Sequence, residues 1–205
     1  MKKTRFILAI FLLFMVTVFM GCSSKAEDTI KDYFTKAEKG EISFAHLVEQ
    51  SMEDKVINKI ESDKFSRQYI DKIYSEFDDN IKSIKYKINS QDVSGNEATV
   101  NITVIGDDLS KNFENVLTQT VKYVVQQAYL DNKMSRDEVN KYINKLVTDM
   151  GKPSSTERTG DIHLEKVNGK WQVKEDDSLV QILTGIESST FDNISSDFEK
   201  IFPKK

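Results

Sequence analysis

The sequence is poor in the residues that build disulfide scaffolds, low-complexity tracts and metal sites. Its 205 residues include one cysteine, two prolines, eight glycines and two histidines. A single cysteine excludes an intramolecular disulfide, and so little proline and glycine excludes collagen-like or low-complexity architecture. With 39% hydrophobic and 30% charged residues, the composition is that of a globular domain.

The chain also lacks an apolar run long enough to cross a membrane comfortably. The basic start 1–5 is followed by a predominantly apolar run over 6–20, which has 15 residues. A spanning helix needs about 20. A short apolar run behind a basic start is typical of a secretory signal, which we predict over residues 1–21.

Gly21 and Cys22 follow this run directly. The pair resembles the lipobox of bacterial lipoproteins, in which a small residue precedes a cysteine that is lipidated and becomes the new N-terminus. Phe19 and Met20 depart from the leucine and the smaller residue common in that pattern. The resemblance implies cleavage before Cys22 and anchoring by membrane lipid at the outer face of the cell membrane. The alternative is an uncleaved signal anchor in which Cys22 is an ordinary small residue.

Basic residues are scarce once the signal is set aside. The signal carries Lys2, Lys3 and Arg5, so its removal takes the net charge from −4 to −7. Nucleic-acid binding depends on phosphate neutralisation by lysine and arginine, so we expect no nucleic-acid partner. The same charge argues against a second, electrostatic attachment to anionic lipid.

Apolar residues recur at helical spacing in the segments 27–39, 44–51 and 65–81. The positions that form these stripes are Ile30, Tyr33, Phe34 and Ala37, then Phe44, Leu47 and Val48, then Phe65, Tyr69, Ile73, Phe77 and Ile81. We therefore predict three amphipathic helices before the first strand.

The period then changes to two, which predicts a first hairpin. Apolar and polar residues alternate over 84–88 and over 98–104, with turn residues at 94–96. One face of this hairpin is apolar and the other polar, as is common in antiparallel sheets.

A second hairpin is predicted around the dipeptide Asn168-Gly169, which favours a type I′ turn. The register that follows places Val167 opposite Lys170, Lys166 opposite Trp171, Leu164 opposite Val173, and Ile162 opposite Glu175. Among the inward strand positions, Lys166 is the one polar residue that we expect.

A helical pair over 108–151 is predicted between the hairpins. Asp107 and Asp108 suit the start of its first helix, and 135–138 form a capping box that opens the second. Two short helices are expected over 178–205. The fold class is therefore α+β, with an antiparallel sheet of two or more hairpins packed on N-terminal helices. We expect 22–26 to form a tether and 27–205 to form one domain.

No group of residues has the spacing of a catalytic, cofactor or metal site. Nucleophilic catalysis needs a nucleophile and a base, but Cys22 is assigned to lipid and the two histidines, His46 and His163, are isolated. Neither histidine has zinc-ligand spacing. Acidic pairs occur at predicted element ends, where carboxylates cap helices, so we expect no catalytic residues, cofactor or metal.

Two aromatic residues, Tyr86 and Trp171, fall on inward strand positions. Plain core is one interpretation of both residues. The other is that they line a ligand cleft between the sheet and the helices, since such clefts are mostly apolar.

The N-terminal helix over 29–40, the alternating hairpin strands and the segment Gly169–Val173 carry a family resemblance. This arrangement resembles uncharacterised lipoproteins of Gram-positive bacteria whose exported domain is cystatin-like, akin to nuclear transport factor 2. The resemblance implies a curved antiparallel sheet wrapped on helices, and it brings no catalytic residues. The pair over 108–151 is long for that fold, and is either an insertion or part of a different α+β topology.

We therefore expect a membrane-anchored exported lipoprotein that acts as a non-enzymatic binding or protein-interaction module. The long helical pair is one surface on which a protein partner would fit. The alternatives are a small-molecule-binding domain with an apolar cleft, and an enzyme of the same superfamily that uses His46 or a helical aspartate.

Overall fold

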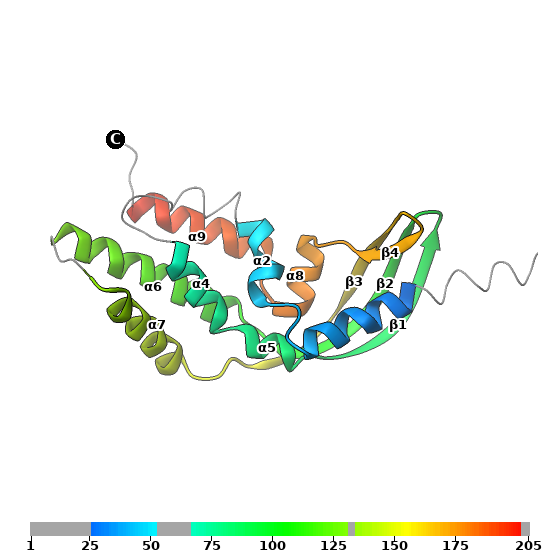
Figure 1. The fold of residues 1–205 in the computed structure, drawn as a ribbon, viewed down its shortest axis with the longest axis horizontal. Coiled ribbons are helices and arrows are strands. Elements are labelled where there is room, and N and C mark those ends of the chain that lie inside the picture. The colour runs from blue at the N-terminus through cyan, green and yellow to red at the C-terminus, as the bar shows by residue number, and fades with distance from the viewer. Residues whose placement is uncertain (1–25, 53–66, 131–133, 202–205) are drawn as a thin grey trace, which may run out of the picture.

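The computed structural model describes residues 26–52, 67–130 and 134–201, and Figure 1 shows them as an elongated α+β molecule. A curved antiparallel sheet lies at one end, and its strand order β1-β2-β3-β4 follows the chain. The strands are β1 (Lys85–Ser94), β2 (Glu97–Asp107), β3 (Ser155–Val167) and β4 (Lys170–Val173). The predicted fold class is confirmed. The predicted signal, the Gly21–Cys22 site and the segment 53–66 lie outside the described residues.

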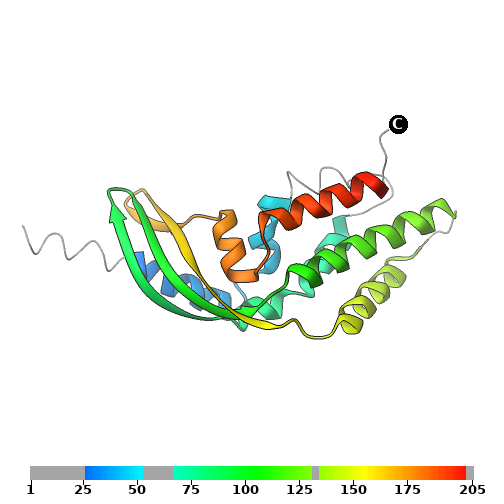
Figure 2. The same ribbon diagram turned by 180° about the vertical axis from the view of Figure 1, so that it is seen from behind.

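Helices cover one face of the sheet and extend beyond it. A helix over 26–38 is followed by α2 (Phe44–Met52), α4 (Arg67–Ser75), α5 (Asp78–Lys82), α6 (Ser110–Tyr129), α7 (Arg136–Met150), α8 (Asp177–Thr184) and α9 (Ser188–Ile201). Figure 2 shows α6, α7 and α9 grouped away from the sheet. The helical pair between the hairpins and the two C-terminal helices are confirmed, and so is the capping box that Ser135 and Glu138 form at the start of α7.

The third predicted helix is wrong in one respect, because it is two helices. A turn at residues 76–77 separates α4 from α5, where the amide of Phe77 donates to the carbonyl of Tyr74. Apolar residues spaced by four drift around a helix that has 3.6 residues per turn. The turn corrects this drift, so that Ile73, Phe77 and Ile81 are all buried.

Both hairpins form, and their apolar faces lie against the helices. In the second hairpin, Leu164 pairs with Val173 and Lys166 with Trp171, as predicted. The pairing of Ile162 with Glu175 is wrong, because β4 ends at Val173. Glu175 instead belongs to the connection that leads to α8. The buried residues on the inner sheet face are Ala98, Val100, Ile102, Val104, Ile162, Leu164 and Trp171.

Strand β3 begins at Ser155, well before the predicted alternation at 162, and pairs with β2 from Ser155 to Glu165. The first half of β3 shows no alternation of apolar residues, because two of its inward positions carry an arginine and a glycine. Arg158 donates from Nε to the carbonyl of Ile182 and from Nη2 to that of Leu183, at the end of α8. Gly160 leaves room for Ile182, whose Cδ1 would lie 2.8 Å from a Cβ there.

Two further expectations near this strand are corrected. Asp107 does not begin a helix, because it pairs with Ser155 at the end of β2, and α6 begins at Ser110. Lys166 is not the one inward polar residue: Arg158 also faces inward, and a bulge between Ile88 and Ser90 turns Gln91 to that face.

Candidate binding groove

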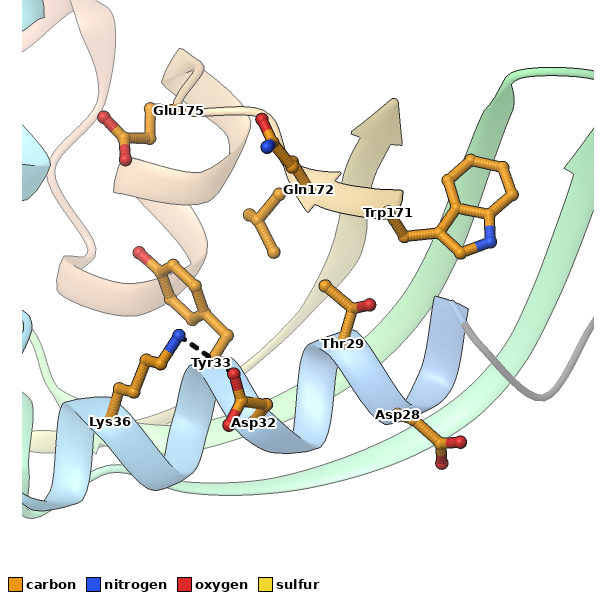
Figure 3. A pocket seen from close by; sticks show the side chains of 9 residues that line it. Asp28, Thr29, Asp32, Tyr33, Lys36, Trp171, Gln172 and Glu175 are labelled. Atoms are coloured by element: carbon orange, nitrogen blue, oxygen red, sulfur yellow. Dashed lines mark ion pairs between the residues drawn. The ribbon is translucent and has the colours of Figure 1, made fainter. Parts of the chain in front are cut away.

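An open groove of about 520 Å³ lies between the helix over 26–38 and the edge strand β4 (Figure 3). Its volume falls in the range of about 300–1,000 Å³ that is usual for ligand sites. The lining residues are Asp28, Thr29, Asp32, Tyr33 and Lys36 on the helix, and Trp171, Gln172, Val173 and Glu175 on and after β4. On the helix, these residues form two adjacent rows with a spacing of four, so they share one face.

The groove runs along the free edge of β4. Side chains alternate between the two faces of a strand, so Trp171, Gln172 and Val173 share a groove only where it follows the strand's edge. The turn at Asn168 and Gly169, with φ of 51° and 78°, places this strand as a two-residue hairpin partner of β3.

The backbone of β4 presents hydrogen-bonding groups to the groove. The amide of Lys174 donates to the carbonyl of His163 on β3, at 2.8 Å. Because the pairing of antiparallel strands alternates, Gln172 also directs its backbone groups to β3. The amides and carbonyls of Trp171 and Val173 therefore point away from the sheet.

Two residues that line the groove each carry a buried polar atom without a hydrogen-bond partner among the described residues, namely the hydroxyl of Tyr33 and Nε1 of Trp171. The residues are only 9% and 7% exposed. The Tyr33 hydroxyl points from the helix toward the connection that carries Glu175 (Figure 3). Burial, with a smaller contribution from the negative charge of Glu175, raises the pKa of this hydroxyl far above its usual value.

The charge of the groove lining is mainly negative. Asp28, Asp32 and Glu175 contribute carboxylates, and Lys36 is the one cationic residue among the nine that line the groove. Lys36 Nζ lies 2.9 Å from Asp32 Oδ2, and this hydrogen bond raises the pKa of the lysine. Each of the three carboxylates already has a partner: Asp28 pairs with Lys31, Asp32 with Lys36, and Glu175 with His46.

Both histidines pair with consecutive carboxylates in the connection between β4 and α8. Nε2 of His46 on α2 lies 2.7 Å from Oε1 of Glu175, and Nδ1 of His163 on β3 lies 2.7 Å from Oδ2 of Asp176. Asp176 also caps α8 by accepting a hydrogen bond from the amide of Leu179. These contacts hold one end of the groove in place. His46 is half exposed at its rim.

Tyr86 lies far from Trp171 in the sheet, on the opposite edge strand β1. Its ring stacks on Phe34, with ring centroids 3.9 Å apart and an angle of 11° between the planes. It also lines a separate hollow of about 310 Å³, beside Lys85 and Lys87. The structure therefore does not bring Tyr86 and Trp171 together in one cleft.

The helical pair is built into the core rather than standing apart from it. Its first helix, α6, buries eight residues, among them Phe113, whose ring centroid lies 5.1 Å from that of Phe44. Two large apolar residues, Tyr129 and Leu130, are 69% and 62% exposed at its far end. Among the described residues of this pair, these two are the exposed large hydrophobic residues.

Two of the acidic pairs each contain an aspartate that accepts a hydrogen bond from a backbone amide. Asp78 accepts a hydrogen bond from the amide of Phe44 at 2.8 Å, and Asp108 accepts one from the amide of Ser110 at 3.1 Å. Within the described part of the chain, no group of three or more histidine, cysteine, aspartate or glutamate residues is placed to hold a metal ion.

Sequence reasoning placed Tyr33 in the core stripe and missed its role in the groove. One available signal was the row formed by Asp28, Asp32 and Lys36, which puts charge directly beside that stripe. The other was a hydroxyl on an otherwise apolar stripe, since a buried hydroxyl usually finds a hydrogen-bond partner.

None of the helices in the described ranges is both long enough and apolar enough to cross a membrane. No family model matches the chain, and no curated protein matches it either. Among solved structures, the chain is similar to the crystal structure of the putative lipoprotein YcdA from Bacillus subtilis, with a TM-score of 0.36 and 19% sequence identity. The match covers 76% of this chain and 46% of that one, so this chain spans less than half the length of YcdA.

Proposed function

We propose that this chain is an exported, lipid-anchored lipoprotein that binds a ligand in the groove between the helix over 26–38 and β4. The observation that carries the proposal is an open groove of about 520 Å³ lined by Tyr33 and Trp171, each of which carries a buried polar atom without a partner among the described residues. An unpaired buried polar group costs about 1–3 kcal/mol. A ligand that hydrogen-bonds to these atoms recovers part of that cost, which favours binding at this position.

The proposed anchor is a diacylglyceryl group on Cys22. Two acyl chains give stable attachment, whereas one chain holds only marginally. The described helix begins at residue 26, so the groove lies within a few residues of the anchor along the chain. This proximity supports a role at the membrane surface.

The groove is tested with the whole protein, purified in mild detergent and incubated with an extract of the host envelope. Native mass spectrometry then detects a retained mass, and fluorescence reports on the groove because Trp171 is the only tryptophan. We expect Tyr33→Phe to weaken retention about two- to tenfold, the equivalent of one hydrogen bond. The matched control, Tyr86→Phe at the opposite sheet edge, should leave retention unchanged. Retention of no mass, or equal retention by both variants, contradicts the proposal.

The anchor is tested separately with Cys22→Ser. The unaltered protein should begin at Cys22, carry the mass of a diacylglyceryl group and sediment with membranes. Loss of the added mass together with release from membranes is the result expected for the variant. An unaltered protein without added mass contradicts the lipid anchor.

A second candidate is acid–base chemistry at the groove rim. The contact of 2.7 Å between His46 and Glu175 is the arrangement of a base and its orienting carboxylate. His46→Gln distinguishes the two candidates, because it should abolish turnover in an enzyme while leaving retention in a binding module within about twofold.

A further inference from the structure

The geometry points to the surface of the domain that meets the bilayer: the end of the sheet at which both hairpin turns lie, held at the lipid headgroups by the short chain between Cys22 and Ala26. We call this surface the hairpin end. It consists of the turns at 94–96 and 167–170 and the first turn of the helix over 26–38. The inference rests on the lipid anchor of the proposed function and goes beyond it, because an anchor alone does not specify which surface of a domain contacts the membrane.

The length of the chain between the lipid and the folded domain limits the distance between them. Ala26 follows Cys22 by four positions, so the two residues are at most about 14 Å apart even when the chain is fully extended. The headgroup layer of one leaflet takes up about 5–7 Å of that length. The start of the helix therefore lies within about 9 Å of the outer surface of the headgroups, which is less than the diameter of a helix, about 10–12 Å.

The start of this helix is part of the packed body of the domain. Ala26 and Ile30 are both fully buried, and both belong to the hydrophobic core. The limit on distance at Ala26 therefore applies to the folded surface that surrounds it.

Both hairpin turns lie at this end of the domain. The amide of Lys166 donates to the carbonyl of Asn96 at 2.8 Å, so the two turns are neighbours. Trp171, which follows the second turn, lines the groove together with Asp28 and Thr29 of the first helical turn. Figures 1 and 2 show the helix start and both turns at one end of the molecule and the end of α6 at the other. The Asp28–Trp171 end of the groove therefore lies beside the headgroup layer, and α6 points away from the membrane.

The composition of the hairpin end suits contact with neutral headgroups. Val167, in the second turn, is a large hydrophobic residue that is 37% exposed. Two basic residues, Lys166 and Lys170, lie beside it, and two acidic residues, Glu97 and Glu165, pair across β2 and β3 next to them. Attraction of anionic lipid, about 1 kcal/mol for each basic residue near the surface, is therefore offset by repulsion. The contact depends on the short chain and not on anionic lipid.

The test uses the lipidated full chain in vesicles of phosphatidylcholine, part of which carries a spin-labelled headgroup that quenches fluorescence at short range. The chain has one cysteine, whose sulfur is bonded to the lipid in the anchored protein, so an introduced cysteine is the one reactive thiol. Lys170→Cys places a fluorophore at the hairpin end, and Leu130→Cys places it at the end of α6, both at exposed positions. We expect quenching by about half or more at position 170 and by less than about a tenth at position 130, because only the first lies within about one helix diameter of the headgroups.

Two further measurements isolate the cause of the contact. A flexible Gly-Ser insertion of about twelve residues between Lys25 and Ala26 gives a chain with a root-mean-square span of about 20–24 Å. Quenching at position 170 should fall about twofold or more in this variant. Replacing about a third of the phosphatidylcholine with phosphatidylglycerol should leave quenching at position 170 unchanged, because the charges of the hairpin end offset one another.

The outcomes separate this inference from the proposed function. Quenching at position 170 and not at position 130 supports the hairpin end as the surface that meets the bilayer. Weak quenching at position 170, or equal quenching at both positions, in a protein that carries the lipid overturns the inference and leaves the anchor standing. A protein without the mass of the lipid overturns the anchor and this inference together, while retention of a ligand in the groove is measured independently. Undiminished quenching in the insertion variant, or quenching that requires phosphatidylglycerol, overturns the short chain as the cause of the contact.

Discussion

The two edges of the sheet differ in length, in regularity and in what lies beside them. The edge strand β1 has ten residues, carries Lys85 and Lys87 on its exposed face and is interrupted by a bulge. Lysines and bulges are the usual devices that stop an edge from pairing with another chain. The edge strand β4 has four residues, is regular over its whole length and faces an open groove.

The helix over 26–38 lies between these edges. Two neighbouring residues of the helix make different contacts with the two edge strands. Phe34 stacks on Tyr86 of β1 and is 4% exposed, so it closes that side. Tyr33 lines the groove beside β4 and leaves its hydroxyl unpaired within the described structure. One side of this helix therefore packs on β1, and the other side borders an open groove beside β4.

The largest expected effect is at the contact between the helix over 26–38 and β1. Phe34→Ala removes a buried ring and its stacking partner's contact, so it should lower the free energy of unfolding by about 3–5 kcal/mol. Urea denaturation measures the loss. Tyr86→Leu, which keeps an apolar side chain, should cost much less. A loss below about 1 kcal/mol for Phe34→Ala would show that this side is not closed by packing.

The two hairpin turns offer a matched comparison of the edges. Gly95 and Gly169 have φ of 62° and 78°, and neither has an atom within 4 Å of an added Cβ. Each change to alanine should therefore cost about 1–2 kcal/mol through backbone conformation alone. Hydrogen exchange at Lys170 and Gln172 should accelerate in Gly169→Ala and stay unchanged in Gly95→Ala. Equal acceleration in both variants would mean that β4 does not separate from β3 independently of the rest of the sheet.

Tyr33→Phe should raise the free energy of unfolding at pH 7 by about 1 kcal/mol, because it removes a buried hydroxyl that has no partner among the described residues. Burial raises its pKa in the folded protein. The neutral hydroxyl thus contributes stability that is complete below about pH 10, the unfolded pKa, and is lost as pH rises above it. Denaturation at pH 8 and pH 11 measures this effect. The free energy of unfolding of the variant, relative to that of the wild type, should be higher at pH 11 than at pH 8. No gain would contradict burial of this hydroxyl.

The smallest effect on stability is expected from Lys85→Thr combined with Lys87→Thr, which should stay within about 0.5 kcal/mol of the wild type. Removing both charges exposes the β1 edge to pairing with another molecule. Sedimentation velocity should then show larger species than the wild type forms. Lys122→Thr on α6 is the control, and an unchanged sedimentation profile for the double variant would show that the lysines do not protect β1.

Much of this architecture could be predicted from local pattern. Period-two alternation located β2, and Asn168-Gly169 located the turn that fixes the pairing of Lys166 with Trp171. The first half of β3 could not be predicted, because Arg158 and Gly160 occupy inward positions for reasons that lie in α8. The alternation of apolar and polar residues along a strand reflects which side chains are buried in the core. At positions 158 and 160, the residue type instead reflects contacts with α8.

The candidate site follows the same division. The sequence by itself determined the inward direction of Trp171 and Tyr86 and the shared helix face of Asp28, Asp32 and Lys36, because helical and strand periods act over a few residues. Only the tertiary structure decided that Tyr86 stacks on Phe34 while Trp171 borders a groove with Tyr33 and Glu175. The position of the helix over 26–38 relative to the two edge strands depends on contacts between residues that are far apart in the sequence. Local periodicity does not encode those contacts.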